Sequence, residues 1–335
     1  MPQSTRLLAN RLVSAVSLGC MSLSHGYGEK SSSKHSEKFL HQALDSGYTM
    51  LDTAAVYGHG HNESMIGQFI SQRRSEFFLA SKCGFGQQPD SQPSINGRPE
   101  YIKATCEASL KRLQTDHIDL YYLHRRDMNV PLEDSIGALA DLCQEGKIGA
   151  VGVSEISAAD LYKAHAEHPI SAIQSEYSLW TRNVEIEVLE ASQKIGAAFV
   201  AFSPLARGFL TNKLHDTSQL VEHDLRHTMP RFNAQHYPAN LALLPAYISL
   251  AERQGCTPAQ LALAWVLTQG DHIIAIPGTQ NLAHLKQNIA ANDLELDADI
   301  VVELNDLINQ HTVQGARYSD KAQATVTTER FSKKD

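Results

Sequence analysis

One stretch of the chain, residues 52–63, concentrates side chains that can carry out chemistry. It reads DTAAVYGHGHNE and holds an acid (Asp52), a phenol (Tyr57), two histidines two positions apart (His59 and His61) and a glutamate. Paired histidines with a carboxylate suit a metal site, closely spaced glycines suit a phosphate-binding loop, and an acid with a phenol suits proton transfer. The rest of the chain has to decide between these three kinds of site.

The composition is that of a globular chain with one large core. The 335 residues are 42% hydrophobic and 20% charged, and no segment approaches the roughly 20 apolar residues of a membrane-spanning helix. The net charge of −8 and the lack of a basic run argue against a nucleic-acid or membrane-surface partner. The N-terminal apolar stretch is interrupted by polar residues, unlike a secretory signal. We therefore expect a cytoplasmic protein without nucleic-acid or membrane partners.

The cysteines agree with a reducing compartment. They are odd in number, widely scattered and free of any C-x-x-C pair: Cys20, Cys83, Cys106, Cys143 and Cys256. This spacing favours reduced thiols over a disulfide framework or a zinc cage.

Short apolar runs alternate along the chain with amphipathic helical patterns. The predicted strands cover residues 15–19, 49–53, 77–82, 118–124, 150–155, 172–177, 198–203 and 273–278. The predicted helices cover residues 36–47, 63–74, 99–113, 131–146, 157–168, 185–196 and 257–270. Buried strands joined by helices are typically parallel, and eight such units indicate a closed (β/α)8 TIM barrel. An open doubly wound sheet would normally carry G-x-G-x-x-G after its first strand, and this sequence has none.

We expect a single barrel domain over residues 1–335. Within it, residues from about 6 to 14 are predicted to form a short β-hairpin that plugs the bottom of the barrel. Residues from about 318 to 335 are predicted to form a C-terminal tail. Extended loops are expected at the C-terminal rim.

In such a barrel the chemistry lies at the carboxyl ends of the strands. The polar residues that end or closely follow the predicted strands are Asp52, Tyr57, Lys82, His124, Ser154, Gln174 and Tyr177. A tyrosine is a poor acid or base near neutral pH unless a nearby cation favours its phenolate. Lys82 is expected to be that cation, held by Asp52, while His124 hydrogen-bonds the reacting oxygen or relays its proton. This set predicts protonation of a carbonyl oxygen as hydride reaches the carbon.

The run from Gly47 to Glu63, followed by Gly67, resembles the signature of the aldo-keto reductases. Other motifs match in order: LGCM (18–21), ASKCG (80–84), IDLYYLHRRD (118–127), GVSE (152–155), QSEYSLW (174–180), FSPLARGFLT (202–211), RHTMPRF (226–232) and IPGT (276–279). The resemblance implies an NAD(P)H-dependent carbonyl reductase without a metal. Its catalytic tetrad would be Asp52, Tyr57, Lys82 and His124, and Arg125 and Arg126 are expected to be rim charges.

The resemblance also implies the cofactor contacts. Ser154 and Gln174 would bind the nicotinamide carboxamide, and Tyr177 would stack on its ring. The pyrophosphate would be wrapped by the backbone amides of Ser203, Leu205, Arg207, Gly208 and Leu210. The last cofactor stretch would contribute Gly278, Gln280, His284 and Asn288. Glu155 stands where some relatives carry Asn.

That last stretch departs from the family pattern. Many NADPH-using relatives read IPGTKR, with a basic pair for the 2′-phosphate, where this chain has Gln280 and Asn281. We expect His284, one turn later, to substitute in part, and Asn288 to match the family's adenine-side amide. NADP(H) is therefore favoured, and NAD(H) is left open.

The substrate pocket is expected to draw on the long rim loops, and its partner is a small-molecule carbonyl. The candidate residues are Met21, His25, Tyr27, Trp180, Arg226, Arg231 and Phe232, which would suit small or aromatic aldehydes. One alternative function is an NAD-preferring alcohol or pyridoxine-type dehydrogenase. Another is a nucleotide-binding regulatory subunit resembling the potassium-channel β subunits, against which the intact tetrad argues.

Overall fold

The computed structural model describes residues 4–24, 26–29, 31–87 and 93–331. Its centre is an eight-stranded sheet whose neighbouring strands are all parallel. In sheet order the strands are β12 (Ile273–Ile276), β11 (Ala198–Phe202), β10 (Ile170–Glu176), β9 (Val151–Ser154), β8 (Leu120–Leu123), β5 (Phe78–Cys83), β4 (Met50–Asp52) and β3 (Leu18–Gly19). Each overlaps one of the runs predicted from the sequence.

The two ends of this sheet meet and close a barrel. Parallel bridges join Val16 to Ala275 and Gly19 to Gly278, across the edge between β3 and β12. A Cβ atom on Gly19 would lie 2.7 Å from the carbonyl oxygen of Ile276, so only glycine allows the strands to approach this closely. The predicted (β/α)8 barrel is confirmed.

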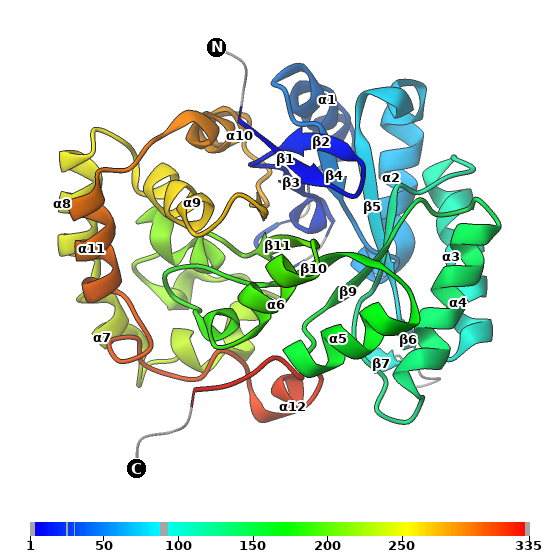
Figure 1. Ribbon diagram of the computed structural model, residues 1–335. Helices are drawn as coiled ribbons and strands as arrows, with labels where there is room; N and C mark the ends of the chain where they lie inside the picture. The colour runs from blue at the N-terminus through cyan, green and yellow to red at the C-terminus, as the bar shows by residue number, and fades with distance from the viewer. Residues whose placement is uncertain (1–3, 25, 30, 88–92, 332–335) are drawn as a thin grey trace.

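Helices surround the strands, as Figure 1 shows. The longer ones are α1 (Ser33–Asp45), α2 (His61–Ile70), α3 (Pro99–Leu113), α4 (Leu132–Gln144), α5 (Ala158–Glu167), α6 (Val188–Lys194), α8 (Leu244–Arg253), α9 (Pro258–Thr268), α10 (Leu282–Ile289) and α11 (Ala298–Leu307). Two begin at caps that the sequence signals: the Ser157 side chain accepts from the Asp160 amide, and Thr257 forms a reciprocal capping box with Gln260. Across the described residues, every helix is too short or too polar to span a bilayer.

Alternation along the strands divides the core in two, because successive side chains point to opposite faces. One set packs outward against the helices. The other fills the barrel: Met50, Phe78, Ala80, Leu120, Tyr122, Ala150, Ala172, Ala198, Val200, Ile274 and Ile276. Leu8 and Val13 join this inner cluster from the hairpin formed by β1 (Thr5–Leu8) and β2 (Arg11–Ser14). The predicted hairpin is therefore present and closes the barrel at its amino-terminal end.

The rim contains two features that the sequence analysis did not specify. A small antiparallel pair, β6 (Phe85–Gln87) and β7 (Pro93–Ile95), follows β5. The C-terminal segment, including the short α12 (Asp320–Gln323), returns to the barrel, where the Thr327 amide donates to the Glu155 carbonyl at 3.0 Å. Figure 1 shows this segment passing close to α5.

The hairpin plug can be tested with two neighbouring leucines. Leu8 is fully buried in the inner cluster, whereas Leu7 is 61% exposed. Leu8→Ala should lower the free energy of unfolding by about 2–5 kcal/mol, because it leaves a cavity. Leu7→Ala should change it by less than about 0.5 kcal/mol. Urea unfolding followed by tryptophan fluorescence measures both, and equal effects would contradict the plug.

Candidate functional site

The predicted tetrad gathers at the carboxyl ends of three neighbouring strands. Asp52 ends β4, Lys82 is the next-to-last residue of β5, and His124 directly follows β8. Each stands two positions after a residue of the inner cluster, so strand alternation turns all three side chains into the barrel. Tyr57 begins a short 3-10 turn after β4 and completes the group.

An ion pair between Lys82 and Asp52 lies at the base of the site, with side-chain exposures of 0% and 2%. Lys82 Nζ also donates to the Thr53 carbonyl oxygen at 2.8 Å, and Gln174 Nε2 donates to Asp52 Oδ2 at 2.8 Å. Burial lowers the pKa of Lys82, but its interactions with Asp52 and Tyr57 together outweigh burial, and the net shift is upward. Lys82 is therefore charged at neutral pH, and hydrogen bonds to both carboxylate oxygens offset part of the cost of burying the charges.

The Tyr57 hydroxyl lies above this ion pair, 3.4 Å from Lys82 Nζ. Burial raises the pKa of Tyr57, and the charge of Lys82 opposes that shift without reversing it. The expected effect of Lys82 on the phenolate is thus present, but the net direction is upward. The phenol keeps its proton at neutral pH, which suits a proton donor better than a resting base.

His124 is buried beside the phenol. Its ring meets that of Tyr57 edge-on, with centroids 6.0 Å apart, and that of Phe85 edge-on at 4.9 Å. Burial, with the charges of Arg125 and Lys82, holds the pKa of His124 well below its usual value. The imidazole is therefore neutral at pH 7, a state in which it can hydrogen-bond a neighbouring oxygen but carries no charge.

Two further residues of the 52–63 stretch, Asn62 and Glu63, hold the loop in place. Asn62 is buried and accepts from the Thr53 hydroxyl at 2.6 Å, while Glu63 is buried and pairs with Arg112 at 2.7 Å. His59 and His61 are exposed. Within the described ranges, no group of three or more His, Cys, Asp or Glu side chains is arranged to hold a metal ion.

A cavity of about 1550 Å³ opens above the tetrad. Most of the predicted cofactor residues line it: Ser154, Gln174, Ser203, Leu205, Arg207, Gly208, Gly278, Gln280, His284 and Asn288. Three of the predicted substrate residues also line it: Met21, Tyr27 and Arg226. His25 lies outside the described residues.

Two features of the lining fit a dinucleotide. The loop after β11 takes left-handed backbone conformations at Ser203, Ala206, Arg207 and Gly208, an arrangement that can turn amide groups toward an anion. The left-handed conformation costs about 1–3 kcal/mol for each of the non-glycine residues among them, and backbone strain of this kind is common at binding sites. At another part of the lining, Asn288 is 1% exposed, and neither of its side-chain amide atoms has a partner among the described residues. A buried amide of this kind is suited to an adenine edge.

The side chains that replace the family's basic pair are already engaged. Gln280 accepts from the Ser31 hydroxyl and donates to the Ser22 carbonyl oxygen. Asn281 caps α10 by accepting from the Ala283 amide at 2.8 Å. The Gln280 amide donor is therefore engaged away from a 2′-phosphate, whereas His284 is exposed on the lining.

Tyr177 does not fit its predicted role. It is fully buried outside the cavity, among Phe199 and Trp265, and its hydroxyl donates to Glu185 at 2.8 Å. The reason is strand alternation: the preceding residue faces inward, so Tyr177 faces the helices. Phe202, at the end of β11, is instead an aromatic side chain on the cavity lining, which the sequence analysis missed.

Leu210 and Trp180 are also corrected. Leu210 is fully buried, and its amide donates to the Leu205 carbonyl at 3.3 Å, as does the Gly208 amide at 3.0 Å. Trp180 stacks on Phe209 with centroids 4.3 Å apart and is 3% exposed. Neither Leu210 nor Trp180 lines the cavity, because both belong to the apolar core beneath the rim.

The model of the aldo/keto reductase family matches residues 15–309. The chain belongs to this family. A probable aldo-keto reductase from soybean, Glycine max, is 38% identical over 312 residues, which are 91% of this chain and 88% of the relative. The family prediction is thereby confirmed, and with it the expectation of an aldo-keto reductase enzyme.

Solved structures of the family share the fold. A glycerol dehydrogenase from Gluconobacter oxydans superposes with a TM-score of 0.85 at 28% identity and covers 95% of this chain and 99% of that one. An aldo-keto reductase from Klebsiella pneumoniae in complex with NADPH gives a TM-score of 0.72 at 28% identity, with the same coverage.

In this family member, a cluster of buried charges supports the rim. Glu155, at the end of β9, pairs with Arg317 of the C-terminal segment, and Glu176, at the end of β10, pairs with Arg207 at 2.5 Å. Arg207 also donates to the hydroxyl of Tyr27 at 2.8 Å. Sequence reasoning noted Glu155 only as a departure from the family and could not find its partner, which lies 162 residues away.

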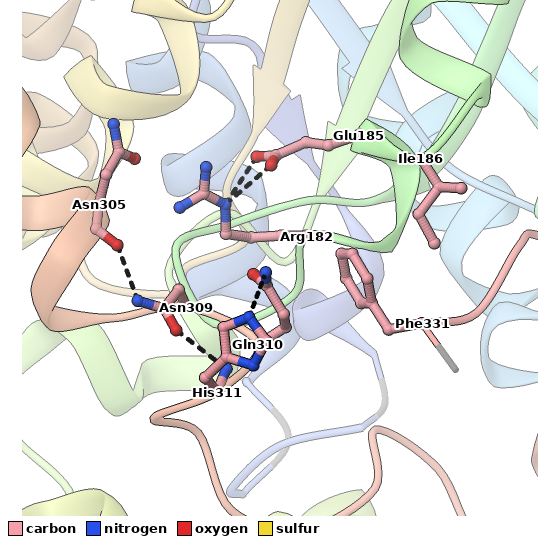
Figure 2. Close-up of a pocket in the computed structure, with 8 residues that line it drawn as sticks. All are labelled: Arg182, Glu185, Ile186, Asn305, Asn309, Gln310, His311 and Phe331. Atoms are coloured by element: carbon pink, nitrogen blue, oxygen red, sulfur yellow. Dashed lines mark hydrogen bonds and ion pairs between the residues drawn. The ribbon is translucent and has the colours of Figure 1, made fainter. Parts of the chain in front are cut away.

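A second, smaller cavity of about 390 Å³ contains none of the predicted site residues. Figure 2 shows Arg182 bonded to Glu185 on one side, and Asn309 bonded to Asn305 on the other. Its polar groups bond largely with one another, and we assign it no role.

The Glu155–Arg317 pair yields a stability prediction. Arg317→Met leaves the Glu155 carboxylate buried without its cation, which should cost about 3–5 kcal/mol. Arg253 serves as the control, since it pairs with Asp299 and Glu303 at the surface with 46% side-chain exposure. Arg253→Met should cost less than about 1 kcal/mol. Chemical unfolding compares the two variants, and a loss of similar size in both would refute the buried pair's role.

Proposed function

We propose that this family member is an NAD(P)H-dependent reductase that converts aldehydes or ketones to alcohols. The observation that carries the proposal is the 3.4 Å contact between Lys82 Nζ and the Tyr57 hydroxyl, above a buried ion pair and beside a large cavity. A bound nicotinamide would supply the hydride. The protein would supply the proton and the electrostatic environment for the developing oxyanion.

In the proposed reaction Tyr57 donates its hydroxyl proton to the carbonyl oxygen as the carbonyl carbon accepts hydride. The phenolate that remains is stabilised by the Lys82 ammonium, which Asp52 holds in position. Neutral His124 orients the carbonyl oxygen through a hydrogen bond. A proton from solvent then restores the phenol, and the alcohol leaves.

The proposed cofactor is NADP(H). Ser154 and Gln174 would hold the carboxamide, the loop after β11 the pyrophosphate, and Asn288 the adenine. The Klebsiella pneumoniae relative, whose structure contains NADPH, supports this choice. The proposed partner of the 2′-phosphate is His284, which is exposed on the lining, since Gln280 is engaged with the loop after β3.

The proposed substrates are small or aromatic aldehydes. Met21, Phe85 and Phe202 give apolar surface to the cavity, and Tyr27 adds an aromatic ring with a polar end. Such a lining suits a flat, largely apolar molecule that carries one reactive carbonyl.

The five cysteines, none of them in a disulfide in the described chain, support a cytoplasmic location.

A second candidate function is NAD-preferring alcohol oxidation. Gln280 and Asn281 favour it, because neither carries the positive charge of the family's basic pair and the Gln280 amide donates to the Ser22 carbonyl oxygen. The similar Gluconobacter oxydans protein is a glycerol dehydrogenase. Parallel fluorescence titrations with NADPH and NADH decide between the two. Tighter binding of NADH would favour the dehydrogenase, and tight binding of either cofactor without turnover would favour a nucleotide-binding regulatory subunit.

The role of Tyr57 is tested by Tyr57→Phe, which removes only the hydroxyl. We expect the rate of aldehyde reduction to fall by roughly a hundredfold to ten-thousandfold, the usual contribution of a general acid. Absorbance decay of NADPH measures turnover. The affinity for NADPH should stay within about twofold, because no proposed cofactor contact is lost.

Tyr162→Phe is the matched control, since Tyr162 is 44% exposed on α5. It should leave turnover unchanged. A Tyr57→Phe variant that is folded, binds NADPH and reduces aldehydes at the original rate would overturn the proposed mechanism.

A further inference from the structure

The arginines that line the cavity differ in how their charges are balanced. Three are paired with acids: Arg126 with Asp160, Arg207 with Glu176 and Arg226 with Asp224. Arg125 also lines the cavity and is half-buried, but no carboxylate of the described residues forms an ion pair with it. The expectation of a simple rim charge therefore fits Arg126 better than Arg125.

The hydrogen bonds of Arg125 leave its Nη2 atom unused. Nη1 makes both bonds, to the His124 carbonyl oxygen at 2.6 Å and to the Ser154 hydroxyl at 3.2 Å. Nε is buried without a partner among the described residues, whereas Nη2 is neither buried nor bonded to any of them. Nη2 is therefore a free charged donor of the kind that binds a carboxylate oxygen through a charge-assisted hydrogen bond.

Contacts between rings connect this guanidinium to the proposed proton donor. The Arg125 guanidinium lies 5.8 Å from the centroid of the Phe85 ring, which is 4.9 Å from that of His124. The His124 ring is in turn 6.0 Å from the ring of Tyr57. Arg125, Phe85, His124 and Tyr57 thus form one continuous wall of the cavity.

Arg125 is poorly placed for the phosphates of a dinucleotide. It follows β8, whereas the left-handed loop at residues 203–208 follows β11, and β9 and β10 separate these strands in the barrel. The ring contacts through Phe85 instead connect Arg125 to His124 and Tyr57, which line the same cavity. A half-buried cation without an acid there is costly unless a ligand supplies the anion.

We propose that Arg125 is a specificity-determining residue that binds a carboxylate on the substrate. The preferred substrates are then aldehydes that carry an anionic carboxyl group, with the carboxylate at Arg125 Nη2 and the carbonyl oxygen at Tyr57. This inference rests on the proposed reductase function and narrows its substrate class.

The test compares 4-carboxybenzaldehyde with its neutral methyl ester. Both carry the same aromatic aldehyde, so the ratio of their kcat/KM values isolates the contribution of the charge. Arg125→Met keeps the length and apolar bulk of the side chain but removes the cation. It should lower that ratio by roughly 10- to 100-fold, the usual effect of losing hydrogen bonds to a charged group, with the loss confined to the carboxylate substrate. Arg125→Lys should recover part of the ratio.

Arg126→Met is the matched control, because it removes the same charge from the adjacent residue, where Asp160 already neutralises it. The ratio of kcat/KM values for the two substrates should be the same in Arg126→Met as in the wild type. If Arg125→Met does not fold, salt added to the wild-type enzyme serves instead, and it should raise KM for the carboxylate but not for the ester.

An unchanged ratio in Arg125→Met would overturn the inference, as would an equal loss for both substrates, which would make Arg125 a positioning residue for Ser154. Wild-type reduction of the ester separates this outcome from failure of the proposed function. An enzyme that reduces neither aldehyde contradicts both proposals.

Discussion

The buried ion pair between Lys82 and Asp52 constrains the architecture of the site. Two charges without solvent are stable only if each is fully bonded, and the bonds come from different strands: Asp52 from β4, Lys82 from β5 and Gln174 from β10. Side chains from these strands meet only inside a closed barrel. Closure in turn depends on the approach of β3 to β12 at Gly19. The chemistry proposed for Tyr57 thus depends on the fold as a whole, because the cation beneath the phenol is held by residues far apart in the sequence.

Buried charges at the rim of the barrel are likewise stabilised by pairing with opposite charges. Glu155 and Glu176 continue the ends of β9 and β10, and each is neutralised by an arginine from a distant segment, Arg317 and Arg207. These pairs hold the C-terminal segment and the loop after β11 against the barrel, where they border the cavity. Of the described arginines that line the cavity, Arg125 is the one without an ion pair to a described carboxylate. The physical argument for an anionic substrate follows from that difference.

Sequence reasoning predicted the strands, the barrel and the inward tetrad because periodicity and strand ends are local properties of the chain. It failed where tertiary packing decides. Tyr177 and Glu176 are adjacent, and only the register of β10 shows that Glu176 faces inward and Tyr177 outward. The partner of Glu155 lies near the end of the chain, beyond any local pattern. The pKa of Tyr57 is raised because the side chain is buried away from water. The sequence indicates the nearby Lys82, which lowers this pKa, but not the burial that outweighs its effect.

The central claim is that the charge of Lys82 lowers the pKa of Tyr57 against the effect of burial. The most direct measurement is the pH profile of alcohol oxidation with NADP⁺, because that direction requires the phenolate. In the wild type the rate should rise with pH as Tyr57 loses its proton. In Lys82→Met the phenolate has lost its cation, so the account predicts a profile displaced to higher pH and a lower rate at neutral pH. A folded Lys82→Met variant with the wild-type profile would contradict the account.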